Sequence, residues 1–324
     1  MRFLGPLRSV VILIALVACA NSPHAQPPTA VAAEIAELWQ EPYDLVERDL
    51  LNGPGGAELA PQPNGSYEFV AFKTTGTNPG YDVKDASGRL WSVKLGIEAQ
   101  SEVTASRILW AMGFWQPASY FMDQFTLTGA DAGVKTHARF RTDLPGWRSA
   151  GEWAWNENAF VDTHQLRGLI VAQLVLNNWD LKTSNNRVYE ATDPAAAPRR
   201  QFMVRDVGSS LGHSKQFRLF AMLGTRGAQG SKNDVDDFEQ QGFIESVEGN
   251  KVRFDYRGMN QALVDTVTVS DVIWACERLA QIPDGHWQAA FKAGRYPPEH
   301  ADRYIRKIKE KIAQGLALKS TATR

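Results

Sequence analysis

The sequence predicts an α+β fold with two lobes, a small antiparallel β lobe and a larger, mainly helical lobe. Two observations lead to this prediction. Strand-like segments joined by tight turns fill residues 67–95, and helical patterns dominate from residue 162 onward. The chain has 324 residues, of which 44% are hydrophobic, and this is enough to build one large core or two smaller ones.

The first 18 residues have the pattern of a signal peptide. Arg2 and Arg8 give a positively charged start, and residues 10–18 form an apolar run too short to span a bilayer. Residues 19–29 are polar and rich in proline, the composition of a linker. We therefore expect the β-rich lobe at 30–140 and the helical lobe at 141–324.

The signal sequence ends in Leu-Val-Ala-Cys at residues 16–19. This segment resembles the bacterial lipobox, and the resemblance implies that Cys19 is lipidated and anchors the protein in the cell envelope. Ala20 follows where Asp would favour retention in the inner membrane, so the outer membrane, on its periplasmic side or at the surface, is the expected location. The alternative is an ordinary secretory signal that is cut near Ala20 or Ala25.

The composition narrows the classes of partner. A net charge of −1 gives no electrostatic reason to expect nucleic acid. Ten tryptophans predict an aromatic core. The alternative is an exposed face that binds envelope glycan or peptide through Trp147, Trp153 and Trp155. Cys276, in an apolar helical run, is expected to be a buried hydrophobic residue.

Strand patterns and turn residues define the predicted small lobe. Helices are expected before it at 30–39 and 44–51. Strands are expected at 67–72, 81–85, 90–95 and, around a turn at 128–131, within 121–140. A helix is expected at 99–113, because apolar residues recur on one side and Gly113 gives a stop signal.

The predicted helical lobe follows an irregular aromatic segment at 145–160. Its first helix is expected to begin at Asp162, whose carboxylate caps the backbone while Gln165 bonds back. The run at 166–176 is almost wholly apolar, so this helix is expected to be buried. Hairpins are expected at 187–205 and 243–256, and helices at 270–282, 286–293 and 297–315.

Residues 180–208 carry the side chains that phosphoryl transfer needs. That reaction requires cations near the phosphates, oxygen ligands for a metal, and a carboxylate that receives the proton of the nucleophile. Asp180 is followed five residues later by Asn185, and Asp206 follows after a short hairpin. Lys182 lies in the same loop as Asp180.

Residues 180–185 resemble the catalytic loop of Ser/Thr protein kinases, and residues 206–208 resemble their metal-binding Asp-Phe-Gly. This resemblance implies that Asp180 is the catalytic base and that Lys182 contacts the γ-phosphate. It implies also that Asn185 and Asp206 hold Mg²⁺, with ATP or another nucleotide as donor.

The resemblance extends back to Lys94, at the end of the third strand. It implies that Lys94 contacts the α- and β-phosphates and pairs with a glutamate on the next helix. Glu102 is the first candidate for that partner, and Glu98 is the alternative. The loop between the first two strands, with Gly76 and Gly80, takes the position of the phosphate-binding loop.

The sequence departs from the kinase pattern in three places. The loop at 73–80 lacks Gly-x-Gly-x-x-Gly, Asn178-Trp179 replaces the usual His-Arg, and no Ala-Pro-Glu follows Gly208. These departures make the chain look closer to atypical relatives, such as toxin kinases, spore-coat kinases and secreted Golgi kinases. The resemblance covers residues 67–212.

The leading functional hypothesis is a membrane-anchored, kinase-like phosphotransferase that binds a nucleotide and Mg²⁺ between its lobes and acts on an unknown protein or envelope acceptor. One observation weighs against it, because an exported lipoprotein faces compartments where ATP is scarce. The alternatives are a non-catalytic scaffold of the pseudokinase type and an envelope glycan- or peptide-binding lipoprotein.

Overall fold

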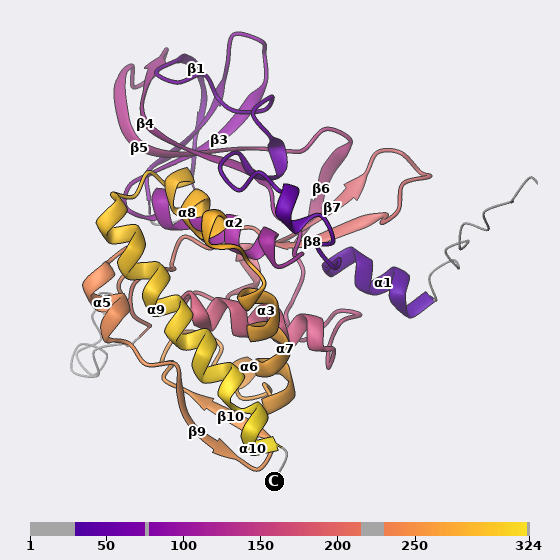
Figure 1. Cartoon of the computed structure of the whole chain (residues 1–324). Helices are drawn as coiled ribbons and strands as arrows, with labels where there is room; N and C mark the ends of the chain where they lie inside the picture. Colours follow the sequence, from indigo (N-terminus) through magenta and orange to yellow (C-terminus); the bar gives the residue numbers. More distant parts are fainter. Residues whose placement is uncertain (1–29, 75–77, 215–229, 323–324) are drawn as a thin grey trace, which may run out of the picture.

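A computed structural model describes residues 30–74, 78–214 and 230–322. The chain forms a small β lobe above a larger, mainly helical lobe (Figure 1), so the predicted α+β class with two lobes is confirmed. The predicted signal peptide, the linker with Cys19, and Gly76 lie outside these residues. Within them, no helix combines the length and apolar character needed to span a membrane.

The small lobe is a closed five-stranded barrel with the order β1-β2-β3-β5-β4. Its strands are β1 Ser66–Phe72, β2 Gly80–Lys84, β3 Leu90–Leu95, β4 Ala118–Thr128 and β5 Gly133–Thr142. The predicted strands are found, and the barrel closes through a parallel pairing of β1 with β4. Large aromatic side chains such as Trp91, Phe125 and Phe140 fill the interior.

Helix α2 (Glu98–Ala111) follows β3 and connects the two lobes. It contacts β3, β4 and β5 of the barrel and also α8 (Asp284–Ala293) of the helical lobe. Its second half, from Ala105, belongs to the main hydrophobic core. Because both lobes cover it, even its polar residues Ser101 and Glu102 are buried.

Helix α3 (His164–Val175) begins with a different cap from the predicted one. The Thr163 side chain accepts a hydrogen bond from the Leu166 backbone N–H. The predicted cap Asp162 instead has a left-handed backbone (φ +69°) and pairs with Arg167. The prediction failed because two neighbouring residues are able to cap, and only the chain direction before the helix decides between them.

A three-stranded sheet, β6 (Trp147–Gly151), β7 (Asn186–Ala191) and β8 (Arg200–Val204), contacts α1 (Ala30–Leu38) through β8. The β7–β8 hairpin was predicted. Strand β6 was predicted to be irregular, and this was wrong because it pairs with β7 through Trp147 to Gly151. Val188, Phe202 and Val204 of this sheet face the main core.

The remaining helices, turns and strands lie before, within and after these elements. They are α1 Ala30–Leu38, η1 Leu45–Glu47, η2 Gly53–Gly55, η3 Thr183–Asn185, α5 Val235–Gln240, β9 Ile244–Glu248, β10 Lys251–Phe254, α6 Gln261–Val264, α7 Val269–Ala280, α9 Pro298–Ala317 and α10 Lys319–Ala322. The predicted helix at 44–51 was wrong, since only the short turn η1 forms there. Helix α1 packs against α3 and β8. The lobe boundary at residue 140 remains a prediction.

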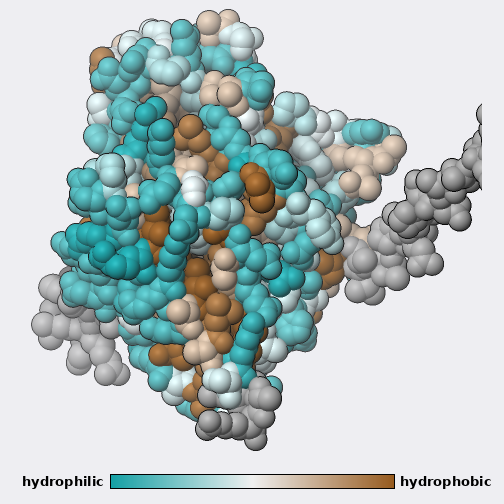
Figure 2. Space-filling model, viewed as in Figure 1, coloured by the Kyte–Doolittle hydropathy of each residue, from teal (hydrophilic) through white to brown (hydrophobic). Residues whose placement is uncertain are grey.

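The tryptophans mainly serve the core. Trp153 and Trp155 are buried, so they are not available to bind a glycan or peptide at the surface. Cys276 is also buried, and burial raises the pKa of its thiol to about 12, as expected for a hydrophobic residue. Hydrophilic residues cover most of the face shown in Figure 2, and hydrophobic ones gather in a band across the helical lobe.

Candidate active site

Lys94, at the end of β3, connects three carboxylates. Its ammonium nitrogen Nζ lies 2.9 Å from Glu102 Oε2 and 3.1 Å from Glu98 Oε2, both on α2. It also lies 2.7 Å from Oδ2 of Asp206, which follows β8. The predicted glutamate partner and its alternative therefore both contact Lys94, and a residue of the β lobe meets one that follows the β7–β8 hairpin.

Glu102 forms ion pairs with two arginines in addition to Lys94. Arg139 and Arg141, both on β5, place Nε and Nη1 at 2.7 Å and 3.2 Å from Glu102 Oε1. Only 2% of the Glu102 side chain is exposed, so its charge depends on these neighbours. Neither arginine was predicted from the sequence, although the alternation Arg139-Phe140-Arg141 indicates two cations on one face of a strand.

The charges in this network favour ionised side chains. Burial opposes the charge of Lys94, but Glu102, Asp206 and Glu98 raise its pKa above the ordinary value. Burial likewise opposes ionisation of Asp206, but Lys94, with Arg141 and Arg139, lowers its pKa well below the ordinary value. Asp206 is therefore a carboxylate at neutral pH, the state that is needed to bind a metal cation.

Lys232 is a second cation at this end of the network. It forms an ion pair with Glu98, and its Nζ lies 5.1 Å from the ring centroid of Trp179. Trp179 stands beside Asp180 at a position where the kinase pattern has arginine. Lys232 was not predicted as a site residue. It lies far from α2 along the chain, so no short sequence pattern connects it to Glu98.

Buried amides fix the loop that carries Asp180. Asn177 has a left-handed backbone (φ +56°), and its side chain donates to the Gly212 carbonyl at 2.7 Å. The neighbouring Asn178 donates to Gln173 Oε1 on α3 at 2.8 Å and accepts from the Asp180 N–H at 3.2 Å. The Asn178-Trp179 pair that replaces His-Arg thus contributes an amide that holds the loop in place.

Asn185 joins the Asp180 loop to Asp206. Its side-chain nitrogen donates to the Asp180 carbonyl at 2.6 Å, and its own carbonyl accepts from the N–H of Asp206 at 3.1 Å. Among the described residues, no hydrogen-bond donor contacts Asn185 Oδ1. The amide oxygen is therefore available as a ligand beside Asp206.

The Asp180 carboxylate has one oxygen engaged and one without a partner. Oδ2 lies 2.9 Å from Lys182 Nζ, so Lys182 neutralises its neighbour. Oδ1 is buried and has no hydrogen-bond partner in the part of the chain that the structure describes. A buried carboxylate oxygen without a donor has unused acceptor capacity.

Gly80 opens β2 directly opposite Lys94. A Cβ there would lie 2.6 Å from the Val93 carbonyl oxygen, so only glycine lets the two strands approach this closely. Its carbonyl accepts from the Lys73 N–H at 2.9 Å, which closes the base of the loop. The loop at 73–80 thus begins and ends beside the Lys94 end of β3.

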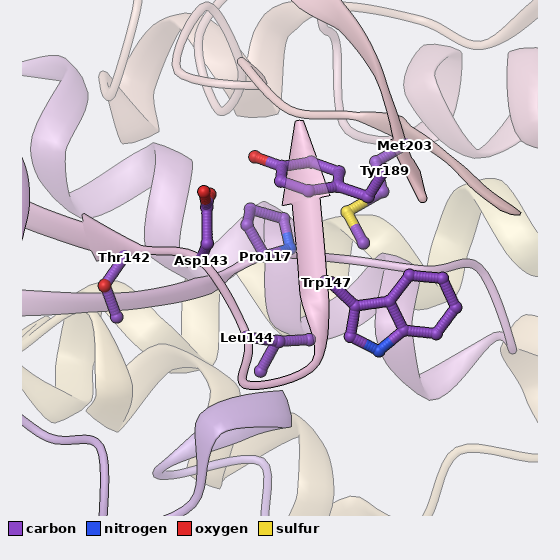
Figure 3. Close-up of a pocket in the computed structure, with 7 residues that line it drawn as sticks. All are labelled: Pro117, Thr142, Asp143, Leu144, Trp147, Tyr189 and Met203. Atoms are coloured by element: carbon purple, nitrogen blue, oxygen red, sulfur yellow. The ribbon is translucent and has the colours of Figure 1, made fainter. Parts of the chain in front are cut away.

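A small pocket lies where the lobes join. Pro117, Thr142, Asp143 and Leu144 line it from the β lobe and its linker, and Trp147, Tyr189 and Met203 line it from the sheet (Figure 3). The gap between these side chains is too small to hold a water molecule, so the residues pack closely where the lobes meet.

The site contains few side chains of the types that bind metals. Among the described residues, no three His, Cys, Asp or Glu side chains converge so as to hold a metal. Asp206 and Asn185 supply a carboxylate and an amide oxygen, the ligand types that suit Mg²⁺ bound together with substrate phosphates.

No protein-family model and no curated protein matches the sequence. Among solved structures, the chain is similar to the proinflammatory kinase CtkA of Helicobacter pylori, at 13% identity, with 79% of this chain and 97% of that chain covered and a TM-score of 0.46. It is similar to a Golgi casein kinase, at 8% identity, with 82% and 76% covered and a TM-score of 0.42. It is also similar to the Rio2 kinase of Chaetomium thermophilum in a complex with ADP and Mg²⁺, at 14% identity, with 76% and 72% covered and a TM-score of 0.30.

Proposed function

We propose that this protein is a kinase-like phosphotransferase that moves a phosphoryl group from a nucleotide or related phosphate donor to a hydroxyl acceptor. The observation that carries this proposal is the contact of Lys94 with Asp206, made while Glu98 and Glu102 also hold Lys94. Glu98 and Glu102 also pair with Lys232, Arg139 and Arg141, so they serve to hold Lys94 in place. Among the described residues, Asp206 has Lys94 as its one ion-pair partner, and we assign its carboxylate to ligand and metal binding.

The ion pair between Lys94 and Asp206 is suited to exchange with a ligand. An entering phosphate accepts hydrogen bonds from the Lys94 ammonium group, and both Asp206 oxygens then become free to bind a cation. About a third of the Asp206 side chain is exposed, so this face is open to such an exchange. Meanwhile Glu98 and Glu102 keep Lys94 in position.

A divalent cation fits the oxygens that the protein offers. Asp206 and Asn185 would hold Mg²⁺, and the backbone hydrogen bond between them keeps the two residues adjacent. When bound, the metal neutralises charge on the phosphates during transfer.

Asp180 is the proposed general base. Its free oxygen Oδ1 takes the proton of the acceptor hydroxyl as the acceptor oxygen attacks the terminal phosphorus. The new bond joins this oxygen to phosphorus, while the bond between the terminal phosphorus and the bridging oxygen of the donor breaks. The electron pair of that bond leaves with the shortened donor. Lys182, paired with Asp180, supplies positive charge beside the transferred group.

The protein is further proposed to be exported and lipid-anchored through Cys19, so that its acceptor lies in the cell envelope. This part rests on the lipobox-like segment at 16–19. A Cys19→Ser variant is expected to leave the membrane fraction. Recovery of that variant in the membrane fraction at the level of the unchanged protein would contradict the anchor.

The central test is metal-dependent nucleotide binding to the purified full chain. ATP, GTP and ADP, each with Mg²⁺ or Mn²⁺, are screened by thermal unfolding. A ligand at a hundred times its Kd stabilises the folded state by about 2.7 kcal/mol. We expect Asp206→Asn to remove the effect of the metal and Lys94→Met to remove binding. Lys84→Met, which breaks the exposed ion pair with Glu68, is the control that keeps both.

The absence of a shift with every nucleotide–metal pair, in a chain that is otherwise folded, would contradict the proposal. Asp180→Asn separates a transferase from a binding protein. In a transferase this variant binds ligand normally but loses roughly 100-fold or more of its phosphoryl transfer. If the variant keeps its biological effect in cells, the non-catalytic scaffold is the better description.

A further inference from the structure

Three arginines meet beside the proposed site. The sheet face opposite the core carries Arg187, Tyr189 and Met203, and Arg205 directly follows β8. Arg187 pairs in register with Met203, while the Arg205 N–H bonds to the Asn185 carbonyl, so the two arginines are neighbours on adjacent strands.

The third arginine comes from the other lobe. Arg141 on β5 donates from Nη1 to the Arg205 carbonyl at 3.0 Å. Arg205 in turn interacts electrostatically with the Tyr189 side chain, which lies at the lobe junction. Arg141, Arg187 and Arg205, here called the arginine cluster, therefore draw guanidinium groups from both lobes toward one place.

The charge of this cluster is poorly balanced. Arg141 shares Glu102 with Arg139 and Lys94, and Arg187 has only Glu152, at 3.8 Å. Arg205 forms no ion pair with any described residue. The Arg187 Nε atom is buried and has no hydrogen-bond partner among the described residues.

The charges of Arg141 and Arg187 both repel that of Arg205. Guanidinium groups crowded together with too few carboxylates are stabilised when an anion binds.

The cluster lies to one side of the Lys94–Asp206 pair. Along β5, Arg139 is opposite Lys94, Arg141 is opposite Ser92, and the linker at 143–146 comes next. A ligand with phosphates at Lys94 that extends toward the linker thus reaches the arginine cluster. An uncharged nucleobase at this place would shield the guanidinium groups from water without neutralising their charge. A second phosphate group would form ion pairs with them. The exposed Asp143 marks the end of this cationic stretch.

We propose that the arginine cluster is an anion-binding subsite, and that the preferred phosphoryl donor is a polyphosphate chain that lacks a nucleoside. The proposal rests on the proposed function, whose donor class it specifies. With inorganic tripolyphosphate, transfer breaks the terminal P–O–P bond and forms a P–O bond to the acceptor hydroxyl oxygen. Asp180 takes the hydroxyl proton, and pyrophosphate leaves with the electron pair of the broken bond.

The test compares inorganic tripolyphosphate with ATP, each with Mg²⁺, by calorimetric titration of the full chain. We expect tripolyphosphate to bind about tenfold or more tightly than ATP. Arg187→Met and Arg205→Met are each expected to weaken tripolyphosphate binding by about tenfold or more, the range for a hydrogen-bonded ion pair, and ATP binding by less than about threefold. Arg205→Lys, which keeps the charge, is expected to restore part of the loss.

Arg148→Met is the matched control, because Arg148 lies on the neighbouring strand β6 with 67% of its side chain exposed. Each variant is first checked for an unchanged cooperative melting transition, and Arg205→Lys replaces any methionine variant that does not fold. Equal affinity for ATP and tripolyphosphate, or equal losses for both ligands, would overturn the subsite.

The two proposals fail in different ways. If tripolyphosphate binding depends on the arginines but neither Mg²⁺ nor Asp206→Asn affects it, the subsite is real and the metal-dependent transferase is not. If Mg²⁺ and Asp206 matter but the arginines do not, the transferase stands and the polyphosphate donor is rejected.

Discussion

The two halves of the lobe junction treat buried charge differently. In the paired half, Lys94 contacts Glu98, Glu102 and Asp206, and every one of these carboxylates has a cation within 3.1 Å. In the arginine cluster, Arg141 shares Glu102 at 3.2 Å, the nearest carboxylate of Arg187 is 3.8 Å away, and Arg205 has none among the described residues. Each half contains residues from both lobes, and the two halves lie a few residues apart along β5.

We infer from this difference that the charges of the paired half stabilise the fold, whereas the arginine cluster is stabilised by binding an anion. A buried ion network with complete pairing loses stability when one member is removed, because its partners are left uncompensated. A crowded cluster of like charges behaves in the opposite way, since removing one member relieves repulsion. The sign of the stability change is therefore a direct test of which half a residue belongs to.

The largest effect is expected for Glu102→Gln. This change leaves Lys94, Arg139 and Arg141 without the carboxylate that they share, so the free energy of unfolding should fall by about 3–5 kcal/mol. Urea denaturation measures it. Glu190→Gln, which breaks an exposed pair with Arg148, should cost at most about 1 kcal/mol. Equal losses for both variants would show that the paired half has no special role in folding.

A pH titration of stability is the next test of the paired half. The pKa of Asp206 is lower in the folded state than its ordinary 3.8, so its contribution is complete above that value and is lost as the pH falls below it. The pKa of Lys94 is raised above 10.5, so its contribution is complete below that value and is lost as the pH rises through the raised pKa. The melting temperature should therefore decline below about pH 4, and less steeply in Asp206→Asn. Identical slopes would contradict the pairing.

Lys232→Met probes the outer edge of the paired half. It removes the ion pair with Glu98 and the contact over the Trp179 ring, while Lys94 still compensates Glu98. The expected loss of unfolding free energy is therefore smaller, about 1–2 kcal/mol. Chemical denaturation measures it, with Lys309→Met at the exposed pair with Asp284 as the control. A loss as large as that of Glu102→Gln would mean that Glu98, not Glu102, is the main anchor of Lys94.

The site residues that lie close to one another along the chain were predicted from the sequence. Strand β3 and the start of α2 are adjacent in the chain, so Lys94 and the two glutamates follow from local periodicity. Asp180, Asn185 and Asp206 likewise lie on one loop and one hairpin. The arginine cluster was predictable only in part, because the predicted hairpin brings Arg187 and Arg205 together, whereas Arg141 joins them only once the lobes have packed. The parallel closure of the barrel by β1 and β4 depends on the same kind of long-range contact.

The smallest effect, and the one of opposite sign, is expected for Arg205→Met. The change removes the repulsion from Arg141 and Arg187 and loses the favourable interaction with Tyr189. Because methionine fills a similar volume without charge, the free energy of unfolding without ligand should rise, by up to about 1 kcal/mol. That corresponds to an increase in melting temperature of roughly 2–4 °C. Added tripolyphosphate should reverse the order, since only the unchanged protein keeps the full cluster. A clear destabilisation without ligand would instead place Arg205 with the paired residues that hold the fold together.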